Sequence, residues 1–176
     1  MKDFKSKTVL VTGASSGIGE AFSNQLAEKG ANLIIVARSQ NDLQTLAECI
    51  KQKYSVQCYP IAMDLAKENA AQELFDKISS LKLGVDVLIN NAGFGAIGNF
   101  EDYELNKYKS MLQLNINTLT ELCWLYLPSM KKKNSGGIIN VASTASFLPI
   151  PFSAVYAGSK SYVLNFSESL FGELLK

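Results

Sequence analysis

Residues 7–19 read Lys-Thr-Val-Leu-Val-Thr-Gly-Ala-Ser-Ser-Gly-Ile-Gly, and this stretch decides the fold. Its first part, Lys7–Val11, is a short apolar run that predicts a buried strand. The glycine-rich part predicts a sharp turn, and the apolar spacing after it predicts a helix over Ile18–Lys29. Glycines between a strand and a helix let phosphate oxygens approach the backbone amides, where the helix dipole favours negative charge. We therefore expect a phosphate-binding loop.

Further along the chain, apolar runs alternate with amphipathic segments. The predicted strands are Ala31–Ala37, Val56–Met63, Val85–Asn90 and Gly137–Val141, and the predicted helices are Gln40–Lys53, Glu68–Ser80, Tyr103–Lys133 and Ser153–Leu175. The longest helix is expected to bend or break near Ser110. Continuous apolar strands predict a parallel sheet that helices cover on both faces. We expect a single α/β domain over residues 1–176, a Rossmann-like doubly wound parallel sheet with strand order 3-2-1-4-5.

The composition argues against several kinds of partner. A formal net charge of +1 does not suit a nucleic-acid-binding protein. The chain has no histidine, and its three cysteines, Cys49, Cys58 and Cys123, are widely spaced, so we expect no metal site. No apolar run approaches the roughly 20 residues that span a bilayer, and the amino terminus lacks the features of a signal peptide. A cytoplasmic protein with no membrane partner is the expectation.

Two residues of the last predicted helix form a candidate proton-transfer pair. Tyr156 and Lys160 stand at positions i and i+4 and therefore share one face of that helix. A phenol ordinarily keeps its proton up to about pH 10, and a neighbouring ammonium group favours the phenolate. Ser143, just past the Gly137–Val141 strand, can donate a hydrogen bond to a substrate oxygen. Each residue also has an ordinary alternative: a core tyrosine, a solvated lysine and a strand-end cap.

Taken together, these motifs resemble the short-chain dehydrogenase/reductase superfamily over the whole chain. The resemblance implies an enzyme that transfers a hydride between a nicotinamide cofactor and a carbonyl or alcohol substrate. The residues that carry it are the Thr-Gly-x-x-x-Gly-x-Gly form of residues 12–19, Asn90-Asn91-Ala92-Gly93, Ser143, and Tyr156 with Lys160.

The resemblance also implies catalytic roles. Tyr156 would be the proton donor and acceptor, and Ser143 would bind the substrate oxygen. Lys160 would also hold the nicotinamide ribose. Asn115 matches the asparagine that holds a water in a proton relay toward the lysine, and Asn117, two residues on, is the alternative.

The same resemblance implies a set of cofactor-binding residues, in which Asn91 and Gly93 are expected to be partly structural. Asp64 has a competing interpretation as a helix N-cap. The set comprises Gly13, Ser15, Ser16, Ile18, Gly19, Arg38, Asp64, Leu65, Asn91, Ala92, Gly93, Tyr156 and Lys160.

Arg38 indicates which nicotinamide cofactor binds. An acidic residue at the end of the second strand would accept hydrogen bonds from the ribose hydroxyls and repel a 2′-phosphate. The chain has Ala37-Arg38-Ser39 there instead. A guanidinium can hold a phosphate in a charge-assisted pair worth about 1.5–3 kcal/mol. We therefore expect NADP(H) rather than NAD(H), the alternative being a surface arginine that opens the next helix.

The chain departs from the family after the last helix, where members usually continue through a sixth strand, a substrate lid and a seventh strand. The fifth strand is thus expected to be an open edge of the sheet. Either the chain is a fragment or truncated version of a longer one, or another subunit covers this edge. The remaining apolar wall favours a moderately hydrophobic ketone or alcohol substrate; it comprises Phe94, Gly95, Ala145, Phe147, Leu148 and Pro149.

Two other functions stay open. One is a 3-oxoacyl-thioester reductase, which the near-neutral charge supports little because carrier-protein docking usually needs a basic surface. The other is a truncated, catalytically weak or silent dinucleotide-binding module. Apolar stripes on Leu112–Met130 and Ser153–Leu174 also predict a homo-oligomer that forms through these helices.

Overall fold

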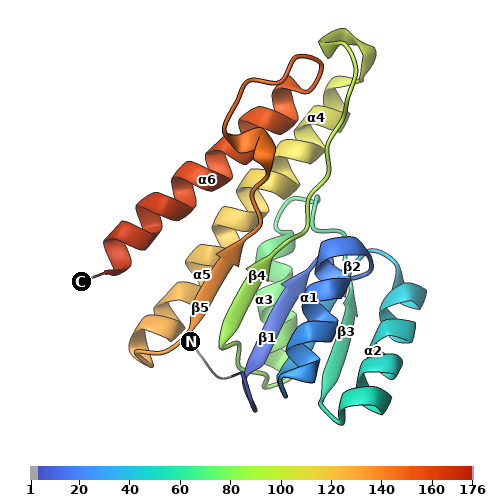
Figure 1. Ribbon diagram of the computed structural model, residues 1–176, viewed down its shortest axis with the longest axis vertical. Helices are drawn as coiled ribbons and strands as arrows, with labels where there is room; N and C mark the ends of the chain where they lie inside the picture. The colour runs from blue at the N-terminus through green and yellow to red at the C-terminus, as the bar shows by residue number, and fades with distance from the viewer. Residues whose placement is uncertain (1–3, 176) are drawn as a thin grey trace.

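The computed structural model describes residues 4–175, which contain a five-stranded parallel sheet flanked by helices (Figure 1). The strands stand in the order β3-β2-β1-β4-β5. The predicted fold class and strand order are therefore confirmed. The strands are β1 Thr8–Thr12, β2 Asn32–Ala37, β3 Cys58–Ala62, β4 Val87–Asn90 and β5 Gly137–Asn140.

Helices cover both faces of this sheet. In the described part of the chain, none of them combines the length and apolar character that a membrane crossing requires. They are α1 Gly17–Glu28, α2 Gln40–Tyr54, α3 Ala70–Ser80, α4 Leu105–Leu112, α5 Leu119–Lys132 and α6 Ala154–Leu174.

Alternate residues of the central strands enter two separate apolar cores. Val9 and Val11 of β1 pack with buried residues of α1 and α2. Leu10, between them, packs with α3 and α5 on the opposite face, where Val163 of α6 joins the cluster. Successive side chains of a strand point to opposite faces, so an unbroken apolar run is what a sheet covered on both sides requires.

The long helix predicted over residues 103–133 is divided differently from the expectation. It does not break near Ser110; α4 and α5 are instead joined by a π-helical turn, Gln113–Thr118. Two buried side chains of this turn are held by distant residues. Asn115 bonds the backbone of Phe94, and Thr118 Oγ1 donates to Leu65 O at 2.8 Å. Because such contacts come from the tertiary structure, helix propensity alone does not reveal the wider turn.

Several other predicted boundaries also shift, by one or two residues. The third strand begins at Cys58 rather than Val56. The helix predicted to start at Glu68 starts at Ala70, because Asn69 adopts a left-handed conformation with φ of +60°. Asn69 therefore ends the preceding turn, and the helix can begin only after it.

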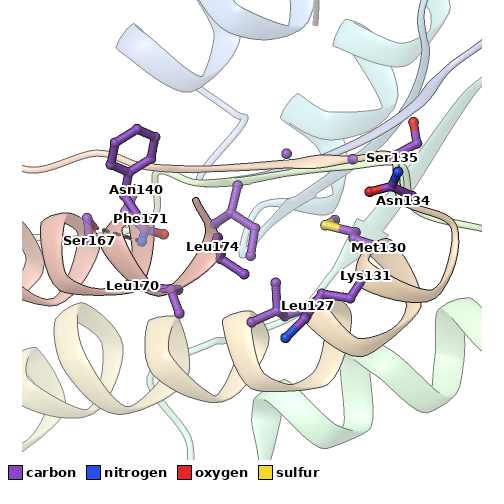
Figure 2. A pocket seen from close by; sticks show the side chains of 13 residues that line it. Leu127, Met130, Lys131, Asn134, Ser135, Asn140, Ser167, Leu170, Phe171 and Leu174 are labelled. Carbon is purple, nitrogen blue, oxygen red and sulfur yellow. Dashed lines mark hydrogen bonds between the residues drawn. The ribbon is translucent and has the colours of Figure 1, made fainter. Parts of the chain in front are cut away.

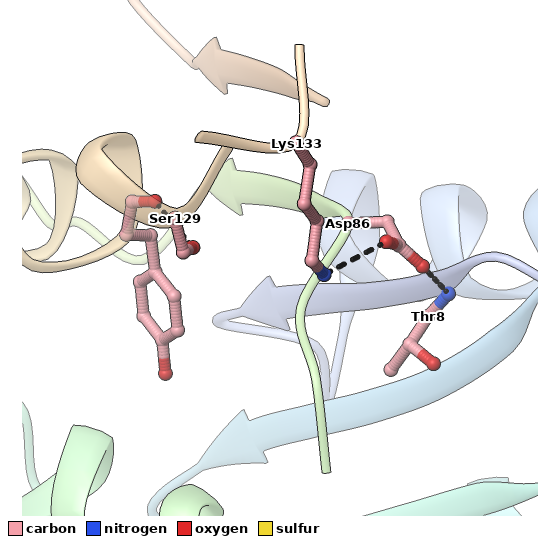
Figure 3. A network of polar contacts seen from close by, with 5 residues as sticks. Thr8, Asp86, Ser129 and Lys133 are labelled. Carbon is pink, nitrogen blue, oxygen red and sulfur yellow. Dashed lines mark hydrogen bonds and ion pairs between the residues drawn. The ribbon is translucent and has the colours of Figure 1, made fainter. Parts of the chain in front are cut away.

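An acidic side chain ties β1 and α5 together before the start of β4 (Figure 3). Asp86 accepts a hydrogen bond from Thr8 N at 3.0 Å, and its other carboxylate oxygen lies 3.5 Å from Lys133 Nζ. This contact is far from the carboxyl ends of the strands, so it holds the sheet together without entering the site described below.

Strand β5 is the outer strand on one side of the sheet, as predicted. Ile139 is 41% exposed, whereas the strand residues of β4 are buried. An apolar groove of about 480 Å³ runs between β5, α5 and α6 (Figure 2). Its apolar lining comes mainly from Leu127, Met130, Leu170, Phe171 and Leu174.

Candidate active site

A cleft of about 940 Å³ opens at the carboxyl ends of the strands. It is lined by the segments that follow all five strands, together with Tyr156 and Lys160 of α6. Strands β2 and β4 lie on opposite sides of β1, so the chain leaves the sheet in different directions on either side of this point. Such a switch point is where doubly wound sheets bind ligands.

The glycine-rich loop forms one end of the cleft. Gly13 and Gly17 have backbone φ angles of +65° and +56°, which residues with a side chain rarely adopt. Ser16, the N-cap of α1, gives the helix no side-chain hydrogen bond, so the first amides of α1 remain available to an anion. Ser15 and Ile18 line the cleft with them. Gly19 does not line it, because it packs beneath the loop, where a Cβ would collide with Gly13 O.

Strand β4 holds this loop in place through Asn91. The Asn91 side chain donates to Thr12 O at 2.9 Å and to Gly13 O at 3.0 Å. The Thr12 hydroxyl in turn accepts from Asn91 N and Ala92 N, each at 3.0 Å. Asn91, which was expected to be partly structural, thus braces the loop, and it also lines the cleft. Thr12 was given no role from the sequence, although it opens the quoted motif.

Arg38 and Asp64 lie along the same cleft, beyond β2 and β3. The side chain of Arg38 is exposed. Asp64 accepts from Ala66 N at 3.1 Å and therefore closes a turn, whereas the N-cap of α3 is Asn69. Asp42 also lines the cleft and was missed. The signal for it is the capping spacing from Ser39, whose Oγ accepts from Asp42 N.

Three predicted catalytic side chains, those of Ser143, Tyr156 and Lys160, line the same cleft. Ser143 Oγ accepts from Ala145 N at 3.1 Å, so its own proton can be donated elsewhere. Lys160 is 6% exposed, and its Nζ donates to Val141 O at 2.7 Å. Burial lowers the pKa of Lys160 below the usual 10.5. The ring of Tyr156 lies against Gly95.

Asn115 does not line the cleft but is buried behind it. The side chain is 1% exposed and pairs with the backbone of Phe94: Nδ2 donates to the carbonyl at 3.0 Å, and Oδ1 accepts from the amide at 3.2 Å. Asn117 is exposed and donates to Gln113. Of the two asparagines, Asn115 is the one next to the site.

The apolar wall expected for the substrate is only partly present. Phe94 and Gly95 line the cleft, and Ala145 is buried. The other members, Phe147, Leu148 and Pro149, line a separate depression of about 530 Å³.

Known proteins resemble this chain in both sequence and structure. The family model described as short chain dehydrogenase matches residues 7–176. The very-long-chain 3-oxoacyl-CoA reductase of Mus musculus is 31% identical over 170 residues, which cover 93% of this chain and 53% of the relative. The chain thus spans about half the length of the curated relatives it matches.

Two solved structures superpose well on the described fold. A short-chain dehydrogenase from Sphingobium yanoikuyae in complex with NADPH has a TM-score of 0.88 and 31% identity, covering 96% of this chain and 65% of that one. L-Sorbose reductase from Gluconobacter frateurii, complexed with NADPH and L-sorbose, has a TM-score of 0.90 and 28% identity, covering 98% of this chain and 66% of that one. From the family match and the site geometry together, the chain belongs to the short-chain dehydrogenase family.

Proposed function

We propose that this protein is an NADP(H)-dependent oxidoreductase that interconverts a carbonyl compound and an alcohol. One observation carries the proposal: a single cleft gathers the glycine loop, Arg38, Ser143, Tyr156 and Lys160. The two solved relatives named above are described as NADPH complexes, which supports the same cofactor here.

The residues of the cleft fit a dinucleotide phosphate. The positive φ of Gly13 and Gly17 and the uncapped start of α1 suit a bound pyrophosphate. Arg38 is the only arginine of the chain and would hold the 2′-phosphate. Asp64 and Leu65 would flank the adenine. When bound, the nicotinamide ring supplies or accepts the hydride.

The chain's own residues would move the proton and orient the substrate. In reduction, the carbonyl carbon gains hydride while the carbonyl oxygen takes the phenolic proton of Tyr156; oxidation reverses both transfers. Ser143 would donate its hydroxyl proton in a hydrogen bond to that oxygen, where negative charge builds up. Lys160 would hold a positive charge near the phenol and so favour the phenolate left by proton transfer. Asn115 would support the lysine through a relay.

Calorimetric titration with NADPH and NADH tests the cofactor. We expect NADPH to bind at least about tenfold more tightly, and Arg38→Gln to weaken NADPH by roughly ten- to a hundredfold while leaving NADH unchanged. Lys51→Gln is the matched control, because it removes an exposed cation from the far end of α2. Equal binding of both nucleotides by the wild-type chain would contradict the proposal. Tight NADPH binding without turnover of any carbonyl compound would favour the silent dinucleotide-binding module.

A narrower candidate is a reductase of 3-oxoacyl thioesters. The near-neutral charge gave this reading little support, but the 3-oxoacyl-CoA reductases among the relatives favour it. Oxidation of NADPH with a 3-oxoacyl-CoA, compared with the matching simple ketone, separates the two substrate classes. A preference for the thioester of about tenfold or more in kcat/KM would favour the narrower candidate.

Assembly and location are also proposals. Trp124 of α5 is 74% exposed, and Tyr162 of α6 is 37% exposed and bonded to Thr120 of α5. Such exposed aromatic groups support a homo-oligomer that forms through these helices, which sedimentation velocity would test. A cytoplasmic location is retained as the proposal, to be checked by fractionation of cells.

A further inference from the structure

Behind the cleft, one buried hydroxyl joins two of the candidate catalytic residues. Ser159 of α6 is 1% exposed and is absent from the lining of the cleft. Its Oγ accepts from Asn115 Nδ2 at 3.0 Å and donates to the backbone carbonyl of Tyr156 at 2.7 Å. A hydroxyl has only one proton, so Ser159 can meet Asn115 only as an acceptor.

The backbone of Phe94 decides which way the Asn115 amide faces, and Ser159 completes the hydrogen bonds of that orientation. The two N–H groups of Nδ2 point to Ser159 Oγ and Phe94 O, and Oδ1 accepts from Phe94 N. Turning the amide over would place Oδ1 against the Phe94 carbonyl oxygen and Nδ2 against the Phe94 N–H. The Phe94 backbone therefore selects one orientation of the amide, and in that orientation Ser159 Oγ is the buried acceptor for the remaining N–H group.

The contacts of Ser159 close a ring that includes the ring of Tyr156. Asn115 grips both polar groups of the Phe94 backbone. The next residue, Gly95, supports the Tyr156 ring, because a Cβ there would lie 3.0 Å from its Cδ2. From Tyr156, the path returns through its own carbonyl to Ser159. One closed set of contacts thus links the Tyr156 phenol, the Phe94–Gly95 backbone after β4 and the Asn115 amide.

We propose that Ser159 is a positioning residue that couples Asn115 to the turn of α6 carrying Tyr156. This role rests on the proposed oxidoreductase function, in which Tyr156 exchanges the proton. Without the hydroxyl, the Asn115 amide loses its acceptor on α6, and the ring of contacts opens at that point. The phenol then samples positions in which proton transfer is less favourable.

Ser159→Ala is the variant that tests the role, and Ser167→Ala is its matched control. Ser167 lies on the same helix, and its Oγ also joins two groups, accepting from Asn140 Nδ2 at 3.0 Å and donating to Val163 O. This second serine borders the groove of Figure 2, away from the cleft. We expect Ser159→Ala to lower kcat about tenfold or more and to leave KM and the NADPH Kd within about threefold. Ser167→Ala should leave all three within about twofold of wild type.

A double-mutant cycle tests whether the effect passes through Asn115. In an Asn115→Ala background, Ser159→Ala should change kcat by less than about twofold, because the coupled partner is already gone. If the fold-losses in kcat of the two single variants multiply to give that of the double variant, the proposal is overturned. Ser159→Thr keeps a hydroxyl that can bond the carbonyl of residue i−3, and should restore kcat to within about threefold of wild type. A well-folded Ser159→Thr chain with the low kcat of Ser159→Ala would also count against the role.

A second measurement needs neither cofactor nor turnover. The side-chain amide protons of Asn115, assigned by their loss in Asn115→Ala, should exchange slowly with solvent in the wild-type chain. Their exchange should accelerate about tenfold or more in Ser159→Ala but not in Ser167→Ala. Unchanged exchange in Ser159→Ala overturns the positioning role. If exchange accelerates in Ser159→Ala but the wild-type chain turns over no substrate, the proposed function is wrong and the coupling between Ser159 and Asn115 still stands.

Discussion

The ring of Tyr156 lies so close to the backbone of Gly95 that a Cβ at position 95 would stand 3.0 Å from Cδ2 and 3.2 Å from Cγ. Few real Cβ atoms lie so close to another side chain, so any residue larger than glycine at position 95 must displace the phenol ring or its own backbone. The position of the candidate proton donor is therefore set partly by a residue that has no side chain.

Gly95→Ala should lower kcat by roughly three- to tenfold, because a shift of a few tenths of an ångström weakens proton transfer. The free energy of unfolding should change by less than about 1.5 kcal/mol, since the ring can yield. The control is Gly158→Ala, at an open, exposed position inside α6; it should stabilise the chain by about 0.5–1 kcal/mol and leave kcat unchanged. Steady-state kinetics and chemical denaturation measure both. An unaffected kcat in Gly95→Ala would show that the contact does not set the phenol.

Gly19→Ala should damage the cofactor loop more than Gly17→Ala. A Cβ on Gly19 would collide with Gly13 O, whereas a Cβ on Gly17 meets no atom within 4 Å and bears only the strain of φ +56°. We expect a loss of about 2–3 kcal/mol in the free energy of unfolding for Gly19→Ala and about 1 kcal/mol for Gly17→Ala. Denaturation curves test this order, and calorimetry should show weaker NADPH binding for Gly19→Ala. Equal losses would contradict it.

Only one of the three thiols should react in the native chain. Cys49 is exposed, whereas Cys58 and Cys123 are buried. Burial raises the pKa of Cys58 to about 12 and that of Cys123 to about 11, so both stay protonated and covered near neutral pH. A thiol-exchange reagent should modify one group per chain quickly and three after denaturation, and Cys49→Ser should remove the fast reaction. Two fast groups in the native chain would be inconsistent with this packing.

Lys160 should make the stability of the chain depend on pH in the alkaline range. Because burial lowers the pKa of Lys160 below 10.5, the unfolded chain keeps this proton to higher pH than the folded chain. The cost of burying the charge is complete below the folded pKa and disappears as pH rises toward 10.5. The free energy of unfolding of wild type relative to Lys160→Met should therefore increase with pH in that window. Titration of the thiols is common to both chains and cancels in this difference; a flat or falling difference would contradict the buried cation.

Much of the fold could be predicted because its signals are local. The apolar run of β1 and the glycines after it specify a strand, a turn and a helix within residues 7–29. The i, i+4 spacing of Tyr156 and Lys160 likewise indicates a shared helix face, and both line the cleft. Periodicity and steric rules act over a few residues, so they are visible in one sequence.

The features that escaped prediction depend on distant contacts. In the π-helical turn, the Asn115 side chain forms hydrogen bonds with Phe94 and Ser159, which lie 21 and 44 residues away along the chain. Capping of α3 was a competing interpretation for Asp64, but the N-cap is the left-handed Asn69, and Asp64 instead accepts from Ala66 N. Ser159 resembles any helical serine until its two partners are known. Tertiary geometry, rather than local pattern, determines these positions.

The bonds from Asn91 to Thr12 and Gly13 also bear on how the chain folds in time. These bonds join residues 78 or 79 positions apart, so the phosphate loop is complete only after β4 has docked beside β1. During synthesis from the amino terminus, the loop's residues emerge early but lack their brace until roughly half the chain exists. Nucleotide affinity would then appear as a late step of folding, which makes a bound nucleotide a reporter of sheet assembly rather than a nucleus for it.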